Sequence, residues 1–280
     1  MKRHPLLTFL LYAAVVLLAL SIVLPIAWLF IMSISQPTDL TTLPLKWFPE
    51  TINLDQYKRL LTLEEGSTGE TFLYALRNST VVAVSATLIS VLAAIPAAYS
   101  FSRFPGRQGL LYGTLAVYMM PPVAFVLPLY LTFSHLGLLN SSWALIIVYC
   151  TMLLPFATWL LKNNFDLLPY EIEQAAIIDG ASQLQVIWHI ALPLIKPALG
   201  AALLFALLMA WDEFFYALIY TNDLRAKTLP VAIGDFAAGR ATDYGLISAV
   251  GMLAALPPLV AALFLQRSLV SGLAAGGTKG

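Results

Sequence analysis

The chain has 280 residues, of which 60% are hydrophobic and only 11% are charged, and its formal net charge is zero. A soluble globular domain is about 25% charged, so this composition excludes an ordinary soluble domain and predicts an integral membrane protein. The equal numbers of basic and acidic residues, 15 of each, exclude a basic nucleic-acid-binding protein and an acidic disordered chain. The single cysteine, Cys150, excludes an intrachain disulfide.

Long uncharged stretches predict the membrane spans, since about 20 apolar residues cross the hydrocarbon core as a helix. The 54 uncharged residues between Arg107 and Lys162 are too many for one helix, and a turn-rich patch from Ser134 to Ser142 divides them into two. The fold class is therefore an all-α integral membrane protein with six transmembrane helices. The spans are expected within residues 8–33, 78–102, 108–161 (two helices), 197–220 and 244–266.

The basic residues orient these spans. Arg103 and Arg107 lie in a very short loop, and Lys2 and Arg3 precede the first span. Short loops rich in Lys and Arg stay on the cytoplasmic side, so both termini are expected inside.

Residues 162–196 form an inner connection far longer than the median of about 4–6 residues, which indicates a function. Pro169 precedes a short predicted helix with Glu171 and Glu173 in its first turn, where carboxylates suit the helix dipole. Asp179-Gly180 predicts the end of that helix. Such a helix buries too little surface to be stable alone, so it needs a partner surface, either another protein or the bilayer and its own chain.

The same segment resembles the EAA signature of ABC-importer permeases, in the form of the carbohydrate-uptake branch. In that family the segment is the coupling helix, which docks in a cleft of the cytoplasmic ATPase. The signature positions here are Gln174-Ala175-Ala176, Gly180, Ile190, Leu192 and Pro193, with Gln174 in place of the signature's acid. The resemblance implies ATPase-coupling roles for Glu171, Glu173, Gln174, Ala175, Ala176, Asp179 and Gly180.

The resemblance extends over most of the chain. Residues 53–61, Asn78-Ser79 and residues 119–133 look like the outer loop, the entry to the second span and the third span of these permeases. Residues 211–214 resemble a Trp-Asn-Glu-Phe motif with Asp212 replacing Asn, and residues 264–280 resemble the C-terminus of the shorter maltose-type or glycerol-phosphate-type subunit. The implied division is an N-terminal span (1–34), an external loop with a short helix (35–71), a permease core (72–267, with the coupling loop 162–196) and a cytoplasmic tail (268–280).

The family implies the partners of such a chain. They are a second permease subunit in a heterodimer, two copies of a cytoplasmic ATPase, an external sugar-binding protein and the lipid bilayer of a bacterial-type inner membrane. Transport would proceed by alternating access. No P-loop motif occurs in the chain, so ATP-Mg is expected on the partner ATPase, with no cofactor, catalytic residue or metal ligand in this chain.

Two breaks in apolar segments predict the substrate pathway. Asp212 and Glu213 interrupt the fifth span, where a charge in hydrocarbon costs at least about 2.5–3.5 kcal/mol. They are expected to face a sugar path, or else to lie at the wet outer interface where the helix ends. The prolines at 121, 122 and 128 are expected to kink or break the third span, and broken helices are tolerated where they line a cavity. The predicted pathway residues are Met119, Met120, Tyr130, Trp211, Asp212, Glu213 and Tyr216.

Two other functions compete with an ATP-driven sugar importer. A self-contained secondary transporter would use Asp212 or Glu213 as its ion site, but the chain lacks the internal repeats of many such proteins. An intramembrane hydrolase would need a nucleophile and a base on facing spans, and no such motif is present. No basic residue lies inside a span, which disfavours a strongly anionic solute.

Overall fold

The computed structural model describes residues 5–42, 47–238 and 243–277, and over these residues it is helical without a strand. The chain divides into two compact units. Unit 1 comprises residues 1–73 and 232–255, and unit 2 comprises residues 74–231 and 256–280. The division predicted from the sequence follows sides of the membrane instead, and it stays a prediction.

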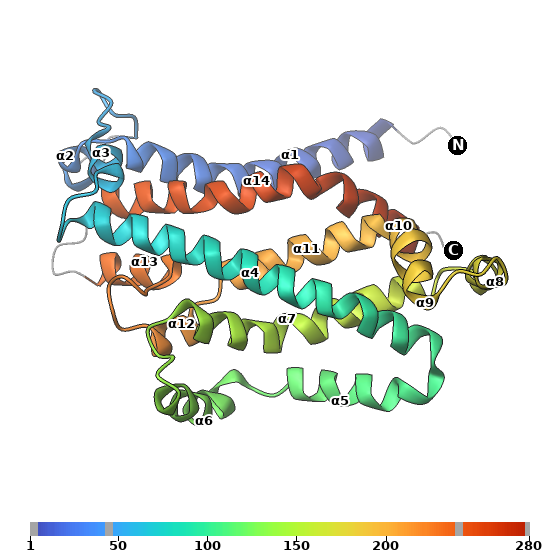
Figure 1. Cartoon of the computed structure of the whole chain (residues 1–280). Helices are drawn as coiled ribbons and strands as arrows, with labels where there is room; N and C mark the ends of the chain where they lie inside the picture. Colours follow the sequence, from blue (N-terminus) through green and yellow to red (C-terminus); the bar gives the residue numbers. More distant parts are fainter. Residues whose placement is uncertain (1–4, 43–46, 239–242, 278–280) are drawn as a thin grey trace. The chain divides into compact units, whose positions relative to one another are not determined.

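Long helices are separated by short ones along parts of the chain (Figure 1). They are α1 (Pro5–Ser33), α2 (Pro37–Thr41), α3 (Asp55–Leu61), α4 (Thr68–Arg103), η1 (Pro105–Arg107), α5 (Gln108–Tyr118), α6 (Pro122–His135), α7 (Ser142–Phe165), α8 (Tyr170–Ile178), α9 (Gln183–Gln185), η2 (Val186–Ala191), α10 (Leu192–Leu194), α11 (Lys196–Trp211), α12 (Phe215–Tyr220), α13 (Leu229–Ala237) and α14 (Tyr244–Gly277).

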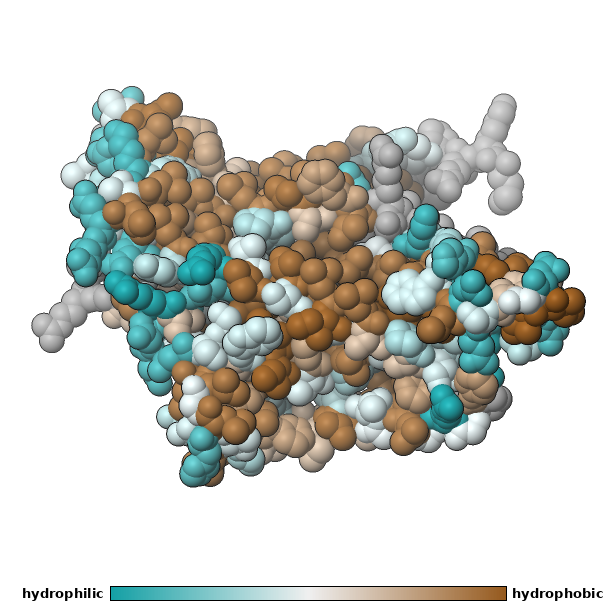
Figure 2. Space-filling view, viewed as in Figure 1, coloured by the Kyte–Doolittle hydropathy of each residue, from teal (hydrophilic) through white to brown (hydrophobic). Residues whose placement is uncertain are grey.

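Four helices are long and apolar enough to cross a membrane, and six spans result if each of two bent helix pairs counts as one. The four lie in residues 8–33, 68–103, 142–165 and 244–266, as the uncharged stretches predict. Figure 2 shows that hydrophobic residues cover much of the visible surface. A largely hydrophobic surface suits a multi-pass membrane protein, because lipid contacts it.

The first bent pair is α5 and α6, which meet at 88°. The predicted break of the third span is thus confirmed at Pro121-Pro122, where two successive residues lack the N–H that would continue the helix. Pro122 then begins α6, because its fixed φ suits the first helical position. The break expected at Pro128 does not occur, because α6 continues through this residue. The helix α14 likewise continues through Pro257-Pro258.

The second bent pair joins residues 183–194 to α11 at 83°. The helix α11 then ends at Trp211, and α12 begins only at Phe215. The fifth predicted span is therefore interrupted at the two acidic residues that also interrupt the apolar sequence.

Unit 2 is built around α7, which packs against α5, α11 and α12. The facing helices carry small buried residues, among them Ala144 and Ala157 on α7 and Ala202 and Ala206 on α11. Small side chains let helix backbones approach closely, which is how helices associate in a bilayer.

Unit 1 holds the predicted surface helix, which is α3. Its buried Gln56 donates to the carboxylate of Asp243 at 3.0 Å, and Tyr57 Oη shares a 2.7 Å hydrogen bond with Ser33 Oγ. These bonds attach α3 to the ends of α1 and α14. The helix α14 itself continues to Gly277, so the predicted tail is helical up to that residue, and residues 278–280 lie outside the described part.

Candidate functional site

The helix α8 lies at one end of unit 2, outside the long helices (Figure 1). It begins after Pro169 and carries Glu171 and Glu173 in its first turn, as predicted. Gly180 ends it with a φ of +91°. The Gly180 N–H donates to Ile177 O at 3.0 Å and the next N–H, of residue 181, donates to the carbonyl of residue 176 at 2.9 Å. These two bonds form a Schellman cap, which confirms the predicted helix end.

Most of the predicted coupling residues lie on the open surface of α8. Glu171, Gln174, Ala175, Asp179 and Gly180 are exposed, and Ala176 is half-buried. Apolar side chains share this surface, above all Ile178, which is 84% exposed. An exposed surface of small and apolar residues at a helix end is the kind that a partner protein covers.

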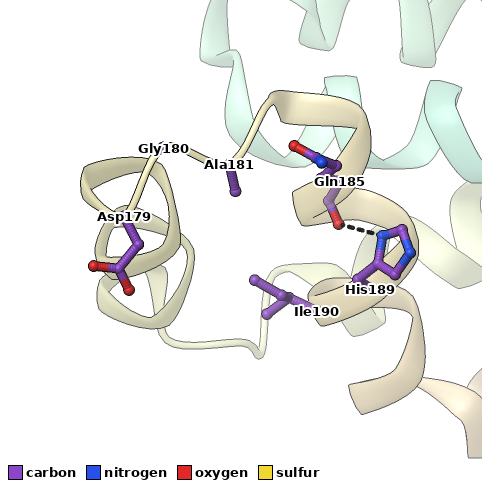
Figure 3. Close-up of a pocket in the computed structure, with 6 residues that line it drawn as sticks. All are labelled: Asp179, Gly180, Ala181, Gln185, His189 and Ile190. Carbon is purple, nitrogen blue, oxygen red and sulfur yellow. Dashed lines mark hydrogen bonds between the residues drawn. The ribbon is translucent and has the colours of Figure 1, made fainter.

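A hollow of about 390 Å³ lies between the end of α8 and the segment that leads to α11 (Figure 3). On the side of this hollow away from α8, the backbone carbonyl oxygen of Gln185 lies 3.3 Å from His189 Nδ1. Gly180 and Ile190 are ten residues apart, yet both line this hollow, so the fold brings two separate signature positions together. The lining residues are Asp179, Gly180, Ala181, Gln185, His189 and Ile190.

Glu173 is the exception among the predicted coupling residues, because it is only 1% exposed. Its carboxylate accepts from Tyr99 Oη at 2.7 Å and from Arg103 Nε at 3.0 Å, both on α4. Arg103 Nη2 also donates to it. The side chain therefore faces its own chain rather than the open surface of α8.

A second pocket, of about 500 Å³, lies at the break between α5 and α6. Three predicted pathway residues, Met119, Met120 and Tyr216, line it, and no charged residue does. The other predicted pathway residues, Tyr130, Trp211, Asp212 and Glu213, are not among its lining residues. The full lining is Val117, Tyr118, Met119, Met120, Pro121, Pro122, Phe125, Leu129, Thr151, Met152 and Tyr216.

The helix α12 forms one wall of this region and is fastened to α6. Tyr220 Oη donates to Val126 O at 3.0 Å, and Tyr216 Oη lies 3.5 Å from Pro122 O. The rings of Tyr130 and Tyr220 lie 6.3 Å apart. Tyr130 thus contacts Tyr220 and is not one of the residues that line the pocket.

Glu213 caps α12. Its carboxylate accepts from the N–H groups of Tyr216 at 2.8 Å and Ala217 at 3.2 Å, so the charge is matched to free donors at a helix start. Asp212, in contrast, is exposed at the end of α11. The two adjacent acids therefore have different surroundings.

We expect Glu213→Ala to lower the thermal stability of the purified chain, because it leaves two N–H groups of α12 without their acceptor. Loss of a helix cap costs about 0.5–2 kcal/mol, which corresponds to a fall of roughly 2–4 °C in Tm per kcal/mol. Asp212→Ala is the matched control and should leave Tm unchanged. The measurement is thermal unfolding in detergent; equal Tm values for the two variants would contradict the capping role.

Several residues of these sites are not predicted by any motif. The sequence predicts only that Arg103 lies in a cytoplasmic loop, but in the structure it binds Glu173, 70 residues further along the chain. Thr151 and Met152 of α7 line the pocket without any motif that marks them. Asn140 adopts a φ of +59°, and its Oδ1 accepts from the N–H of Asn222 at 2.6 Å, which joins the loop before α7 to the loop after α12. The turn-rich stretch around Asn140 was the only signal for this link.

The chain is similar to known proteins over most of its length. Residues 86–274 match the family described as "Binding-protein-dependent transport system inner membrane component". The chain is 33% identical over 286 residues to the trehalose/maltose transport system permease protein MalG of Thermococcus litoralis, with 100% of each chain covered. It is 32% identical over 258 residues to the sulfoquinovosyl glycerol transport system permease protein SmoH of Agrobacterium fabrum, covering 91% of this chain and 88% of that protein.

A solved structure shares the fold. It is a crystal structure of a bacterial ABC transporter involved in the import of the acidic polysaccharide alginate. One of its chains superposes with a TM-score of 0.78 and 22% sequence identity, covering 96% of this chain and 99% of that one.

Proposed function

Since the chain belongs to the family of inner membrane components of binding-protein-dependent transport systems, we infer that it is a sugar permease subunit of an ABC importer. We propose that it forms half of the translocation path. We also propose that α8 couples this path to a separate ATPase. The resemblance inferred from residues 174–193 is thereby confirmed. The secondary-transporter alternative finds no support among the relatives. The observation that carries the proposal is the exposed α8, closed by Gly180 beside a hollow that Ile190 also lines.

The proposed topology has six spans with both termini inside. The two bent helix pairs support it, since each supplies one span when counted as a unit. The bond between Arg103 and Glu173 also supports it, because it places the end of α4 beside α8. The helix α7 lies between these two segments and counts as one crossing, so they share a side of the membrane only if the α5–α6 pair is a second crossing.

The proposed partners are a second permease subunit, two copies of a cytoplasmic ATPase and an external sugar-binding protein, in a bacterial-type inner membrane. The family description supports the binding protein, and the absence of a P-loop in the sequence supports a separate ATPase. ATP-Mg would be bound there, with no cofactor in this chain. ATP-driven closure of the ATPase pair would move α8 and switch the spans between inward-open and outward-open states.

The pocket at the α5–α6 break is the proposed part of the substrate path in this chain. It offers the rings of Tyr118 and Tyr216, on which the C–H faces of a sugar can stack. Because no charged residue lines the pocket, it suits an uncharged part of a sugar. Contacts from the second permease would complete the specificity.

A pull-down tests the assembly. The tagged chain is purified in mild detergent from its own cells, the co-purifying proteins are identified and ATP hydrolysis is assayed. We expect a P-loop ATPase and a second permease in the eluate, with ATP hydrolysis in that fraction. A chain that purifies alone and transports sugar down an ion gradient would contradict the proposal.

A further inference from the structure

Three helix ends of unit 2 meet in one junction. They are the C-terminal ends of α4 and α7 and the first turns of α8, the proposed coupling helix. Glu173 of α8 lies at the centre of this junction, and the side chains of α4 around it are Tyr99 and Arg103. The 66 residues between Arg103 and Tyr170 separate α4 from α8 along the chain, and side-chain contacts bring the two helices together.

The bond between Glu173 and Arg103 is a buried, forked ion pair. The Arg103 Nε lies 3.0 Å from each carboxylate oxygen of Glu173, and Nη2 donates to Oε1. The two side chains are only 11% and 2% exposed. Water therefore replaces neither partner easily, and loss of one partner would leave the other charge buried and unpaired.

Further contacts hold the guanidinium in one place. It lies over the rings of Tyr99, at 5.9 Å, and Tyr170, at 5.7 Å, and Nη2 reaches Leu168 O at 3.4 Å. Arg103 thus contacts α4, the α7–α8 connection and the first residue of α8 together. A planar forked donor of this kind fixes orientation as well as distance.

A second, more exposed line of polar contacts joins α4 to α7. Ser102 Oγ donates to Asp166 Oδ1 at 2.6 Å, and Lys162 Nζ lies 2.6 Å from Asp166 Oδ2. Together with the Arg103–Glu173 pair, these contacts give the junction two basic side chains, Arg103 and Lys162, and two acidic ones, Asp166 and Glu173. The charges within the junction therefore balance.

We propose that the Arg103–Glu173 pair is a positioning clamp, which makes α8 and the cytoplasmic end of α4 move as one body. This inference rests on the proposed function of α8 as the coupling helix. The clamp would carry the motion of the ATPase directly into the second span, in addition to the chain connections from α8 to α7 and α11. It also reassigns Glu173, which acts within this chain instead of touching the ATPase.

The test compares Glu173→Gln with Glu65→Gln in the complete transporter, reconstituted in liposomes with its binding protein. Glu65→Gln is the control for the loss of one carboxylate, since Glu65 is exposed and lies outside α8 and outside the junction. We expect Glu173→Gln to lower the sugar transported per ATP hydrolysed at least about fivefold, within the usual range of coupling between sites. Tyr99→Phe, which removes one hydrogen bond and keeps the ring, should give a smaller loss.

Hydrogen–deuterium exchange of residues 170–178 in the purified chain provides the second readout. Exchange should rise in Glu173→Gln and stay unchanged in Glu65→Gln. Normal sugar transport per ATP in Glu173→Gln would overturn the clamp, whether or not exchange rises. An unchanged transporter whose ATP hydrolysis does not depend on the loaded binding protein would instead contradict the proposed function itself.

Discussion

Replacing Gly180 with Val should nearly abolish sugar uptake while ATP hydrolysis continues. Gly180 has a φ of +91°, a conformation that a β-branched residue adopts only with strain. Among the described residues, apart from the two chain neighbours of Gly180, no atom lies within 4 Å of a Cβ built at this position, so strain and the partner surface are the two possible causes of the defect. A loss of about 1.4 kcal/mol in docking would already lower productive binding tenfold.

The Gly180→Asn variant separates the two causes, because Asn tolerates a positive φ better than Val does. Sugar uptake and ATP hydrolysis are measured in parallel in proteoliposomes. A defect in both variants indicates that the partner surface needs the open space at this position, whereas a defect in Val alone indicates that the Schellman cap is what matters. Normal coupled transport in both would refute the role of the α8 end in docking.

Thr151→Trp should block sugar passage without disturbing α8. Thr151 is on α7 and lines the pocket of about 500 Å³ opposite the α5–α6 break. An indole there would occupy space that a sugar needs, since Trp side chains bury roughly 150–250 Å². We expect sugar uptake to fall at least about tenfold, a change of roughly 1.4 kcal/mol, with ATP hydrolysis still stimulated by the binding protein.

Leu127→Trp is the control for added bulk, because Leu127 is 64% exposed on α6 and does not line the pocket. Radiolabelled sugar uptake by cells that carry each variant, at matched expression, gives the comparison. Full uptake in Thr151→Trp would exclude this pocket from the path. A loss of uptake equal in both variants would point to assembly instead.

Local features of the structure follow from the sequence alone. Uncharged stretches predict the long apolar helices, because a charge is costly in hydrocarbon wherever the chain folds. The break at Pro121-Pro122 and the helix end at Gly180 are equally local. A missing backbone N–H and a positive φ act on the residues next to them, so no knowledge of distant neighbours is needed.

The surroundings of each acidic side chain could be assigned only from the tertiary structure. Glu173 has the same sequence features as Glu171, and only the approach of Arg103 turns one carboxylate inward and leaves the other exposed. Similarly, Glu213 caps α12 whereas Asp212 is exposed, although both interrupt the same apolar segment. Pairing of charges depends on distance in space, which the order of residues along the chain does not specify.

The sequence by itself thus determined the class of protein, the apolar helices, the break at Pro121-Pro122 and the coupling-helix signature, because hydropathy and backbone chemistry act over a few residues. Only the tertiary structure decided which predicted residues share a site. Met119 and Met120 meet Tyr216 in one pocket, whereas Trp211 lies outside it. Those contacts join residues about a hundred positions apart, and they exist because α6, α7 and α12 pack together.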